Sequence, residues 1–248
     1  MKTISSLVAL LSLTILKQVT ALPVAEAEAQ AAPLDAAAVF ARQLGSATSQ
    51  DDILNNNPCK AVTIIFARGT TEAGNVGSLT GPPFFSAVAS AIGSTNLAVQ
   101  GVDYPADVAG FLAGGSAAGS TTFANLITRT YSQCPNTKVV LSGYSQGAQL
   151  VHNAAGKLSS ANAAKISAGT SPPPILPTRF DTNHLRAVVF GDPKKGQVVG
   201  QVAASKVKTI CHIGDNICSG GSLILTPHLT YAQDASDAAA FVKTKTGF

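Results

Sequence analysis

Five short runs of consecutive apolar and β-branched residues constrain the fold of this chain more than any other feature. They lie at residues 61–67, 97–102, 138–142, 185–190 and 207–211. Such unbroken runs are typical of parallel strands, because helices cover both faces of a parallel sheet. Helical patterns alternate with the runs, at about residues 84–92, 121–133, 146–157 and 231–243. The alternation predicts an α/β fold in which helices flank a central, mostly parallel sheet.

The composition agrees with a folded domain and excludes several other classes of protein. Of the 248 residues, 46% are apolar and only 12% are charged, so the chain can bury a substantial core and is neither disordered nor a coiled coil. The net charge is +4, and no three lysine or arginine residues occur in a row. We therefore expect no nucleic-acid partner.

The first 57 residues are expected to lie outside the folded domain, which we place at residues 58–248. Residues 1–21 have a charged start, an apolar run and a small-residue end, the pattern of a secretory signal peptide. Residues 22–42 are expected to be a pro-segment removed after Arg42, or else a tail that is retained, and residues 43–57 a flexible segment. No later apolar stretch is long enough to span a bilayer, so we expect a secreted, extracellular protein without stable membrane insertion.

Secretion would place the four cysteines in an oxidising compartment, where two disulfides are expected. Cys211 and Cys218 enclose six residues, which suits a local bridge, and this leaves Cys59 to pair with Cys134. The longer loop would stabilise the fold mainly by constraining the unfolded chain. The spacings contain no Cys-x-x-Cys pair, so a zinc site is not expected.

One serine has the sequence context of a nucleophile. The third apolar run leads into Gly143-Tyr144-Ser145-Gln146-Gly147, and a helical pattern follows. In a Gly-x-Ser-x-Gly turn between strand and helix the serine has a strained backbone, and side chains at the glycine positions would collide with neighbouring elements. The turn exposes the serine hydroxyl at the carboxyl edge of the sheet. Ser145 is therefore the candidate nucleophile.

A serine nucleophile needs an orienting acid and a histidine base, which follow it in that order in α/β-hydrolases. No glutamate follows Ser145, so the candidate acids are five aspartates: Asp181, Asp192, Asp215, Asp234 and Asp237. Asp215 is preferred because it lies between Cys211 and Cys218, where a disulfide would hold its carboxylate rigidly. His228 follows in a loop after the last apolar run and is the candidate base.

The remaining histidines and Asp192 fit structural roles better. His152 precedes every candidate acid and lies on the helix after the nucleophile, so we expect it to pack or to face solvent. His184 is expected to be exposed, and His212 to be a partly buried strand residue. Asp192 precedes a proline at the end of a strand, where we interpret it as a turn residue.

The oxyanion formed during acyl transfer needs hydrogen-bond donors. One is the backbone amide of Gln146, directly after the nucleophile. A second is expected in the loop after the first strand, Ala67-Arg68-Gly69-Thr70-Thr71-Glu72, where Thr70 offers both an amide and a hydroxyl. The alternative for Thr70 is an ordinary turn residue.

Together these motifs resemble the fungal cutinase family. The resemblance covers about residues 57–245, and its most specific elements are Gly-Tyr-Ser-Gln-Gly and the Cys-x3-Asp-x2-Cys loop with a histidine downstream. It implies a small, lidless α/β-hydrolase with a five-stranded sheet that hydrolyses cutin, a plant-surface polyester, and short soluble esters. The resemblance also implies that Ser145 is the nucleophile, Asp215 the acid and His228 the base. It implies Thr70 and Gln146 as the oxyanion donors. It supports the disulfide pairs Cys59–Cys134 and Cys211–Cys218.

Some features depart from the family pattern or leave other functions open. Cutinases place a serine where this chain has Thr70, the proline-rich stretch 170–177 lengthens the interval between Ser145 and Asp215, and the small-residue stretch 110–119 differs near the cleft. We expect the proline-rich stretch to be an exposed, stiff loop. The alternative activity is an esterase of cell-wall polysaccharide such as acetylxylan, whose known enzymes usually carry more cysteines. A secreted wall-binding protein with an inactive site is the alternative outside enzymes.

The sequence therefore predicts a monomeric, secreted serine carboxylesterase that needs no cofactor and no metal. Its partner would be a polyester or another ester at a plant surface. Because His228 must be neutral to act as a base, we expect activity to rise with pH through about 6 to 7.

Overall fold

The computed structural model describes residues 47–167 and 184–248. The expected signal peptide (1–21), the expected pro-segment (22–42) and the proline-rich stretch (170–177) lie outside the described residues.

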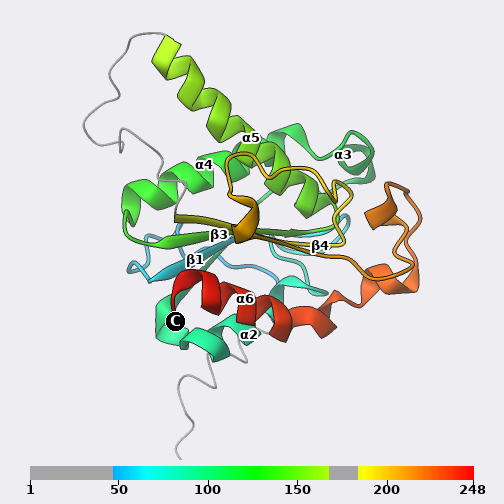
Figure 1. Ribbon diagram of the computed structural model, residues 1–248, viewed down its shortest axis with the longest axis horizontal. Helices are drawn as coiled ribbons and strands as arrows, with labels where there is room; N and C mark the ends of the chain where they lie inside the picture. Colours follow the sequence, from blue (N-terminus) through cyan, green and yellow to red (C-terminus); the bar gives the residue numbers. More distant parts are fainter. Residues whose placement is uncertain (1–46, 168–183) are drawn as a thin grey trace, which may run out of the picture. The chain divides into compact units, whose positions relative to one another are not determined.

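One sheet of five parallel strands forms the centre of the fold (Figure 1), and the α/β fold expected from the sequence is confirmed. The strands are β1 (Val62–Ala67), β2 (Leu97–Gly101), β3 (Lys138–Tyr144), β4 (Leu185–Phe190) and β5 (Val207–Ile210). Their order in the sheet is β2-β1-β3-β4-β5. The chain leaves β1 for β2 on one side and returns to β3 on the other, so the loops after β1 and β3 meet at the carboxyl edge, where α/β sheets bind ligands.

Helices cover both faces of the sheet (Figure 1). On one face lie α4 (Ala117–Gln133) and α5 (Gln146–Ser167), and on the other α2 (Gly81–Ile92) and α6 (Ala235–Thr246). Successive residues of β1 alternate between the two cores: Ile65 packs in the core beneath α4 and α5, and Phe66 in the core beneath α2 and α6. Burial on both faces explains why the strands read as continuous apolar runs.

Several short elements differ from the sequence expectation. The stretch 110–119 was expected to be a loop, but it contains most of the helix α3 (Val108–Leu112) and the first turn of α4. Both helices begin at side-chain caps, because Asp107 accepts from the amide of Gly110 at 2.7 Å and Ser116 from that of Gly119 at 3.1 Å. Short 3-10 helices occupy Ser94–Asn96, Ala204–Lys206, Ile217–Ser219, Thr226–Leu229 and Tyr231–Asp234.

The segment before the expected domain boundary contacts the edge of the sheet. We expected residues 43–57 to be flexible, but the described part, residues 47–57, lies along the edge strand β2. The amide of Asp52 donates to the carbonyl of Val99 at 3.1 Å, and the side chain of Gln100 accepts from the amide of Ile53 at 3.0 Å. Ile53 is buried. The segment therefore covers an edge whose backbone groups would otherwise be unpaired.

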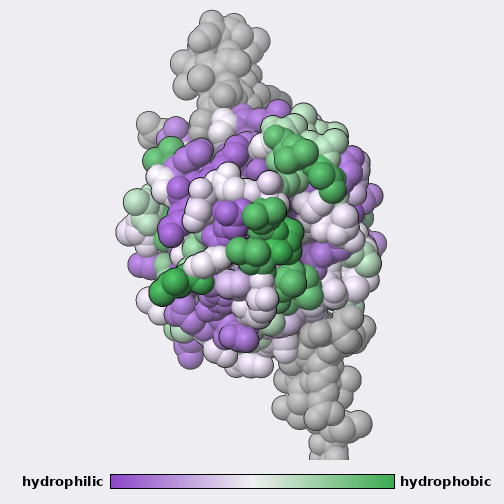
Figure 2. Space-filling view, turned by 90° about the vertical axis from the view of Figure 1, so that its right-hand side faces the viewer, coloured by the Kyte–Doolittle hydropathy of each residue, from purple (hydrophilic) through white to green (hydrophobic). Residues whose placement is uncertain are grey.

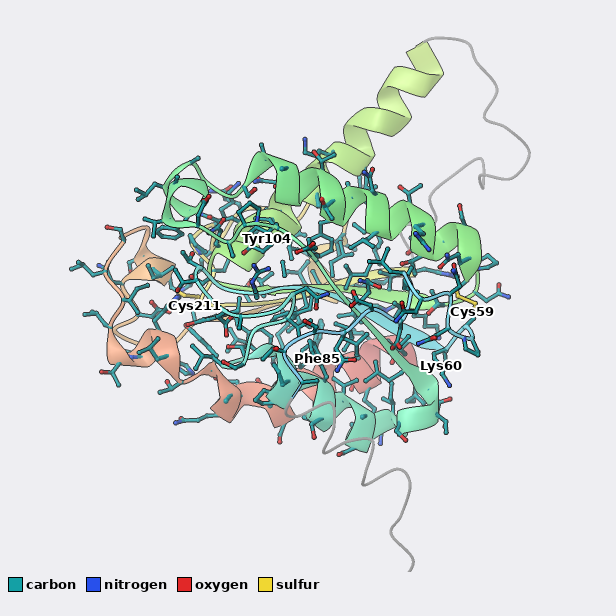
Figure 3. All side chains as sticks on the ribbon, turned by 180° about the vertical axis from the view of Figure 1, so that it is seen from behind. Cys59, Lys60, Phe85, Tyr104 and Cys211 are labelled. Atoms are coloured by element: carbon teal, nitrogen blue, oxygen red, sulfur yellow. A yellow bond between two sulfur atoms is a disulfide. The ribbon has the colours of Figure 1, made fainter. Side chains whose placement is uncertain are left out.

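Both disulfides join the pairs expected from the spacing, Cys59 with Cys134 and Cys211 with Cys218. The Cα atoms are 5.5 Å and 6.1 Å apart respectively. Figure 3 shows Cys59 and Cys211 at opposite ends of the sheet. The first disulfide ties the start of the domain to the end of α4, and the second closes the small loop that contains Asp215.

Candidate active site

Ser145 lies on a tight turn between β3 and α5, with a φ of 57°. Its backbone amide donates to the carbonyl of Phe190 in the neighbouring strand at 3.0 Å, which holds the turn against the sheet. The two flanking glycines are sterically required. A Cβ at Gly143 would lie 2.3 Å from the carbonyl oxygen of Gly147, and a Cβ at Gly147 would lie 1.9 Å from that of Ala67. The Gly-x-Ser-x-Gly pattern is therefore explained by contacts with the following helix and with β1.

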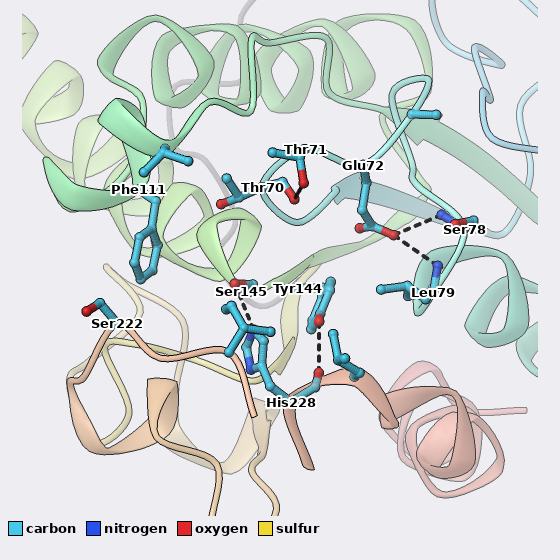
Figure 4. Close-up of a pocket in the computed structure, with 14 residues that line it drawn as sticks. Thr70, Thr71, Glu72, Ser78, Leu79, Phe111, Tyr144, Ser145, Ser222 and His228 are labelled. Carbon is cyan, nitrogen blue, oxygen red and sulfur yellow. Dashed lines mark hydrogen bonds between the residues drawn. The ribbon is translucent and has the colours of Figure 1, made fainter. Parts of the chain in front are cut away.

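Three candidate residues from distant parts of the chain form one hydrogen-bonded chain, and Figure 4 shows its contact between Ser145 and His228. The Oγ atom of Ser145 lies 2.9 Å from Nε2 of His228, and Nδ1 of His228 lies 2.8 Å from Oδ2 of Asp215. All three residues are buried. Because the carboxylate accepts at Nδ1, Nε2 of His228 is left to accept the serine proton.

The carboxylate of Asp215 is held as an anion by its donors. Burial by itself would raise the pKa of Asp215, but hydrogen bonds from Tyr231, His228 and the amide of Ile217 outweigh burial and lower it. The Tyr231 hydroxyl donates to Oδ2 at 2.6 Å, and the Ile217 amide donates to Oδ1 at 2.9 Å. Asp215 therefore remains ionised while it orients His228.

Tyr144 supports the other side of His228. Its hydroxyl donates to the backbone carbonyl of His228 at 2.8 Å, and the two rings lie 5.0 Å apart between centroids (Figure 4). Burial raises the pKa of Tyr144, so its hydroxyl remains a donor. The residue before the nucleophile thus helps to fix the position of the base.

Gln146, directly after Ser145, contacts Thr70 through its side chain. The amide of Gln146 is in the first turn of α5, where N–H groups lack partners within the helix. The side-chain Nε2 of Gln146 donates to Oγ1 of Thr70 at 2.9 Å and to the carbonyl of Asp107 at 2.8 Å. Gln146 therefore offers its backbone amide as one candidate oxyanion donor and contacts the other, Thr70, through its side chain.

The loop that carries Thr70 is fastened by Glu72. The carboxylate of Glu72 accepts from the amide of Gly69 at 2.7 Å and from the amides of Ser78 and Leu79, each at 2.9 Å (Figure 4). No sequence motif marks Glu72 or Tyr231, because Glu72 acts by accepting from backbone amides of its own loop and Tyr231 acts on Asp215, 16 residues earlier in the chain.

The candidate triad opens into an apolar cavity of about 530 Å³. Its large apolar lining residues are Leu79, Val108, Phe111, Ile224 and Leu229. The lining also includes polar side chains: Thr70, Thr71, Glu72, Ser78, Ser145, Ser222 and His228. Further exposed leucines, Leu112 in α3 and Leu223 and Leu225 before His228, lie in the two segments that supply part of this lining. Figure 2 shows apolar surface gathered on this side of the molecule. We call Val108, Leu112, Leu223, Ile224 and Leu229 the apolar rim.

Two of the three histidines set aside from catalysis, His152 and His212, have carboxylate partners of their own. His152 is buried rather than at the surface, with Nε2 3.0 Å from Asp192 Oδ2 and Nδ1 3.1 Å from the carbonyl of Val198. Asp192 is fully buried and also accepts from the amide of Lys194, which is the turn expected before the proline. His212 is partly buried, as expected, but it follows β5 instead of lying in a strand, and its Nε2 lies 2.6 Å from Asp234. Neither histidine contacts Ser145.

Those of the remaining candidates that the structure describes do not line this cavity. Asp181 lies outside the described residues, and Asp237 pairs with Lys208 at 2.8 Å on α6. His184 is half-buried at the start of β4 rather than exposed. Within residues 47–167 and 184–248, no group of three or more histidine, cysteine, aspartate or glutamate side chains could hold a metal ion. In the same residues no helix is both long and apolar enough to cross a bilayer.

Comparisons with known proteins agree on one family. The family model described as Cutinase matches residues 58–246. A cutinase of Botryotinia fuckeliana is 54% identical over 189 residues, which cover 76% of this chain and 85% of the relative. Cutinase cut1 of Trichoderma harzianum is 50% identical over 194 residues, which cover 77% of this chain and 71% of the relative.

Solved structures show the same likeness. The structure of Trichoderma reesei cutinase in complex with a phosphonate inhibitor has a TM-score of 0.66 and 43% sequence identity, and the match covers 85% of this chain and 89% of that one. An acetylxylan esterase structure has a TM-score of 0.57 and 25% identity, and the match covers 77% of this chain and 100% of that one.

Proposed function

The chain belongs to the cutinase family of serine esterases, and from this premise we propose that it is a secreted enzyme that hydrolyses the ester bonds of cutin through Ser145. The observation that carries the proposal is the unbroken chain of hydrogen bonds from Ser145 through His228 to Asp215, whose first two members line a mostly apolar cavity. Short soluble esters are the expected secondary substrates.

The first half of the reaction transfers the acyl group to the enzyme. Nε2 of His228 takes the proton of Ser145, and the serine oxygen attacks the ester carbonyl carbon. The carbonyl oxygen becomes an oxyanion, which the amides of Thr70 and Gln146 and the Thr70 hydroxyl would stabilise. His228 then gives its proton to the leaving alkoxide, so that the alcohol departs and an acyl-serine remains.

The second half returns the enzyme to its starting state. A water molecule in the vacated alcohol site gives a proton to His228 while its oxygen attacks the acyl carbonyl. The second oxyanion collapses, the proton passes from His228 to Ser145, and the carboxylic acid leaves. Asp215 keeps its charge throughout and holds the imidazole in the tautomer that the reaction needs.

The surroundings of the triad support a polymer of apolar acyl chains as the substrate. The cavity presents apolar side chains next to Ser145, and the apolar rim is exposed around it. Contact with an apolar solid removes such a surface from water and lowers the free energy, whereas a hydrated polysaccharide offers less apolar area for this contact. Two disulfides and the signal-peptide pattern at residues 1–21 support secretion.

The proposal is tested by release of soluble hydroxy fatty acids from cutin, with the Ser145→Ala variant beside the wild-type enzyme. We expect release by the wild type, an optimum on short to medium p-nitrophenyl esters such as the butyrate, and loss of both activities in Ser145→Ala. Equal rates in the two proteins would contradict Ser145 as the nucleophile. Ester hydrolysis without release from cutin would retain the esterase and reject the polymer substrate.

Acetylxylan is the second candidate substrate, because an acetylxylan esterase shares the fold at 25% identity. The test is acetate release from acetylated xylan by the same pair of proteins. A preference for p-nitrophenyl acetate over the butyrate, together with acetate release from xylan, would favour this candidate. The apolar lining of the cavity favours cutin.

A further inference from the structure

A second histidine–carboxylate pair lies behind the catalytic acid. Tyr231 separates the two pairs: its hydroxyl donates to Oδ2 of Asp215 at 2.6 Å, and its ring stacks on the ring of His212 with 4.2 Å between centroids. His212 in turn contacts Asp234. The mechanism above uses none of Tyr231, His212 and Asp234.

The hydroxyl of Tyr231 accepts one hydrogen bond and donates another. The backbone amide of His212 donates to Oη of Tyr231 at 3.0 Å, so the oxygen accepts there and its own proton is free to go to Asp215. Tyr231 is 1% exposed, and burial raises its pKa further above the ordinary value with help from Asp215. The phenol therefore remains protonated and donates to the same carboxylate oxygen that accepts from His228.

His212 fastens the segment that carries the base. Its Nδ1 lies 2.8 Å from the carbonyl of Pro227, the residue before His228, and its Nε2 lies 2.6 Å from Oδ2 of Asp234. The hydroxyl of Thr230 lies 3.1 Å from the same Nδ1, so both ring nitrogens of His212 have partners in the surrounding segments. The His212–Asp234 pair thus links the start of α6 to the 3-10 helix Thr226–Leu229.

We propose that Tyr231 is a positioning residue for the Asp215–His228 pair and that His212 with Asp234 holds Tyr231 and the His228 segment in place. This inference rests on the proposed function, because it assigns roles relative to that triad. Removal of the phenol hydroxyl leaves Oδ2 of Asp215 with one strong donor, His228. The Asp215 anion is then stabilised mainly by the protonated imidazole, so protonation of His228 becomes more favourable. As the pH falls, the neutral imidazole that acts as the base is therefore lost at a higher pH than in the wild type.

Other ionisable groups around the Asp215–His228 pair do not reverse the direction of this shift in pH. Tyr144, on β3, faces Tyr231 and His228, with 6.0 Å between the two tyrosine rings, and it stays neutral because burial raises its pKa. Glu72 contributes to the raised pKa of Tyr144, and its carboxylate accepts from the amides of Ser78 and Leu79 (Figure 4). Asp234 is already paired with His212. Loss of the Tyr231 proton donor is therefore the main electrostatic change in a Tyr231→Phe variant.

The test compares Tyr231→Phe with Tyr131→Phe, which removes the hydroxyl of another buried tyrosine, on α4 and away from the triad. For Tyr231→Phe we expect kcat on p-nitrophenyl butyrate to fall about tenfold, with KM little changed, the loss typical of one hydrogen bond to a charged group. We also expect the acid limb of the kcat/KM profile to move up by about 0.5 pH units. Tyr131→Phe should change neither.

A role in folding alone would give a different result. If Tyr231→Phe lowered the melting temperature but kept the wild-type kcat per folded molecule and the wild-type acid limb, the positioning role would be wrong. Asp234→Asn is the second variant, and it should fold because the side chain of Asp234 is partly exposed. It should lower kcat several-fold, and an unchanged kcat would reject the part of the proposal that concerns His212 and Asp234.

The outcome is separable from the proposed function. Loss of activity in Ser145→Ala together with wild-type kinetics in Tyr231→Phe would keep the triad and reject the positioning residue. Full activity in Ser145→Ala would reject the triad itself, whatever Tyr231→Phe shows.

Discussion

The side-chain Nε2 of Gln146 donates to the hydroxyl oxygen of Thr70 at 2.9 Å, and this contact determines which way the Thr70 hydroxyl can point. Because one lone pair of Oγ1 is used by Gln146, the hydroxyl proton is available for an oxyanion beside Ser145. Gln146 also donates to the carbonyl of Asp107, so its amide group is held from two sides. The candidate oxyanion hole is thus preorganised before any substrate binds.

This relationship predicts coupled effects of substitutions at the two positions. Thr70→Val keeps the shape of the side chain but removes the hydroxyl, and we expect kcat to fall about 100-fold, the loss typical of one oxyanion donor. Gln146→Leu should lower kcat about tenfold by freeing the Thr70 hydroxyl. Leucine also removes Oε1 of Gln146, which is buried without a hydrogen-bond partner among the described residues, so folding should be retained.

A double-mutant cycle measures the coupling. In the Thr70→Val background, Gln146→Leu should cost almost nothing more, because the hydroxyl that it orients is already absent. Thr70→Ser is the matched control, and it should keep most of the wild-type kcat. Independent, additive losses would show that the contact between the two side chains has no role in catalysis.

Two glycines of the same helix provide a test of the turn around Ser145. Gly147→Ala places a Cβ 1.9 Å from the carbonyl oxygen of Ala67, so we expect a destabilisation of about 3 kcal/mol or more and a displaced nucleophile. A Cβ at Gly156 meets no atom within 4 Å. Gly156→Ala should therefore stabilise α5 by about 0.5–1 kcal/mol. Chemical unfolding of both variants measures the difference, and similar stabilities would contradict the steric explanation.

Much of this architecture can be predicted from local sequence, and the exceptions have physical causes. The strands were predictable because burial on both faces leaves an unbroken apolar run, as in β1 and β4. The helix α3 was missed because it has five residues, none of them buried, and therefore no apolar period. The order of residues 47–57 could not be predicted from their own sequence, because it depends on hydrogen bonds to Gln100, a buried polar residue in a strand some fifty positions later.

The candidate site divides in the same way. Ser145 and Asp215 lie in motifs whose chemistry is visible in a few neighbouring residues, so the amino-acid sequence alone is enough to nominate them. Tyr231 cannot be nominated in this way, because its role depends on how the turn Tyr231–Asp234 folds over the disulfide loop. The sequence pattern predicted a helix from residue 231, whereas α6 begins at Ala235. The catalytic roles themselves stay predictions until the variants are measured.

Acid should destabilise the fold partly through Asp215. Hydrogen bonds outweigh burial and hold its pKa below the ordinary value of 3.8, so the ionised carboxylate stabilises the folded state above that pH. The stabilisation is lost as the pH falls through the lowered folded-state pKa. We expect the free energy of unfolding of the wild type to decrease more between about pH 5 and pH 2 than that of Asp215→Asn.

Asp237→Asn is the control for this measurement, because the side chain of Asp237 is 65% exposed. Its unfolding free energy should keep the wild-type dependence on pH. The same slope in Asp215→Asn would mean that Asp215 has an ordinary pKa in the folded protein and that its three hydrogen bonds do not favour the anion.

The two disulfides should have separable roles. Cys59 and Cys134 are 75 residues apart, and their removal by paired Ala substitutions should destabilise the fold by about 4 kcal/mol in the chain-entropy view, with kcat preserved below the melting temperature. Cys211 and Cys218 are 7 residues apart, which corresponds to about 2.5 kcal/mol. Their removal should nevertheless lower kcat, because Asp215 lies in the loop that they close. Thermal unfolding and kcat of both double variants test this contrast, and it would be wrong if the long-range pair controlled kcat.

The apolar rim should matter for the polymer and not for small esters. Leu112 and Leu223 are 69% and 64% exposed, and neither is among the residues that line the cavity. Changing both to Gln removes apolar area that would contact a solid polyester but leaves Ser145, His228 and the cavity intact. We expect adsorption to cutin particles and release of hydroxy fatty acids to fall several-fold, with kcat/KM on dissolved p-nitrophenyl butyrate unchanged.

Leu54→Gln provides the control, because Leu54 is exposed in the segment along β2 and belongs neither to the cavity lining nor to the apolar rim. An equal fall on cutin in both variants would assign adsorption to general surface hydrophobicity, whereas loss of butyrate hydrolysis in the rim variant would place the rim in the acyl site itself.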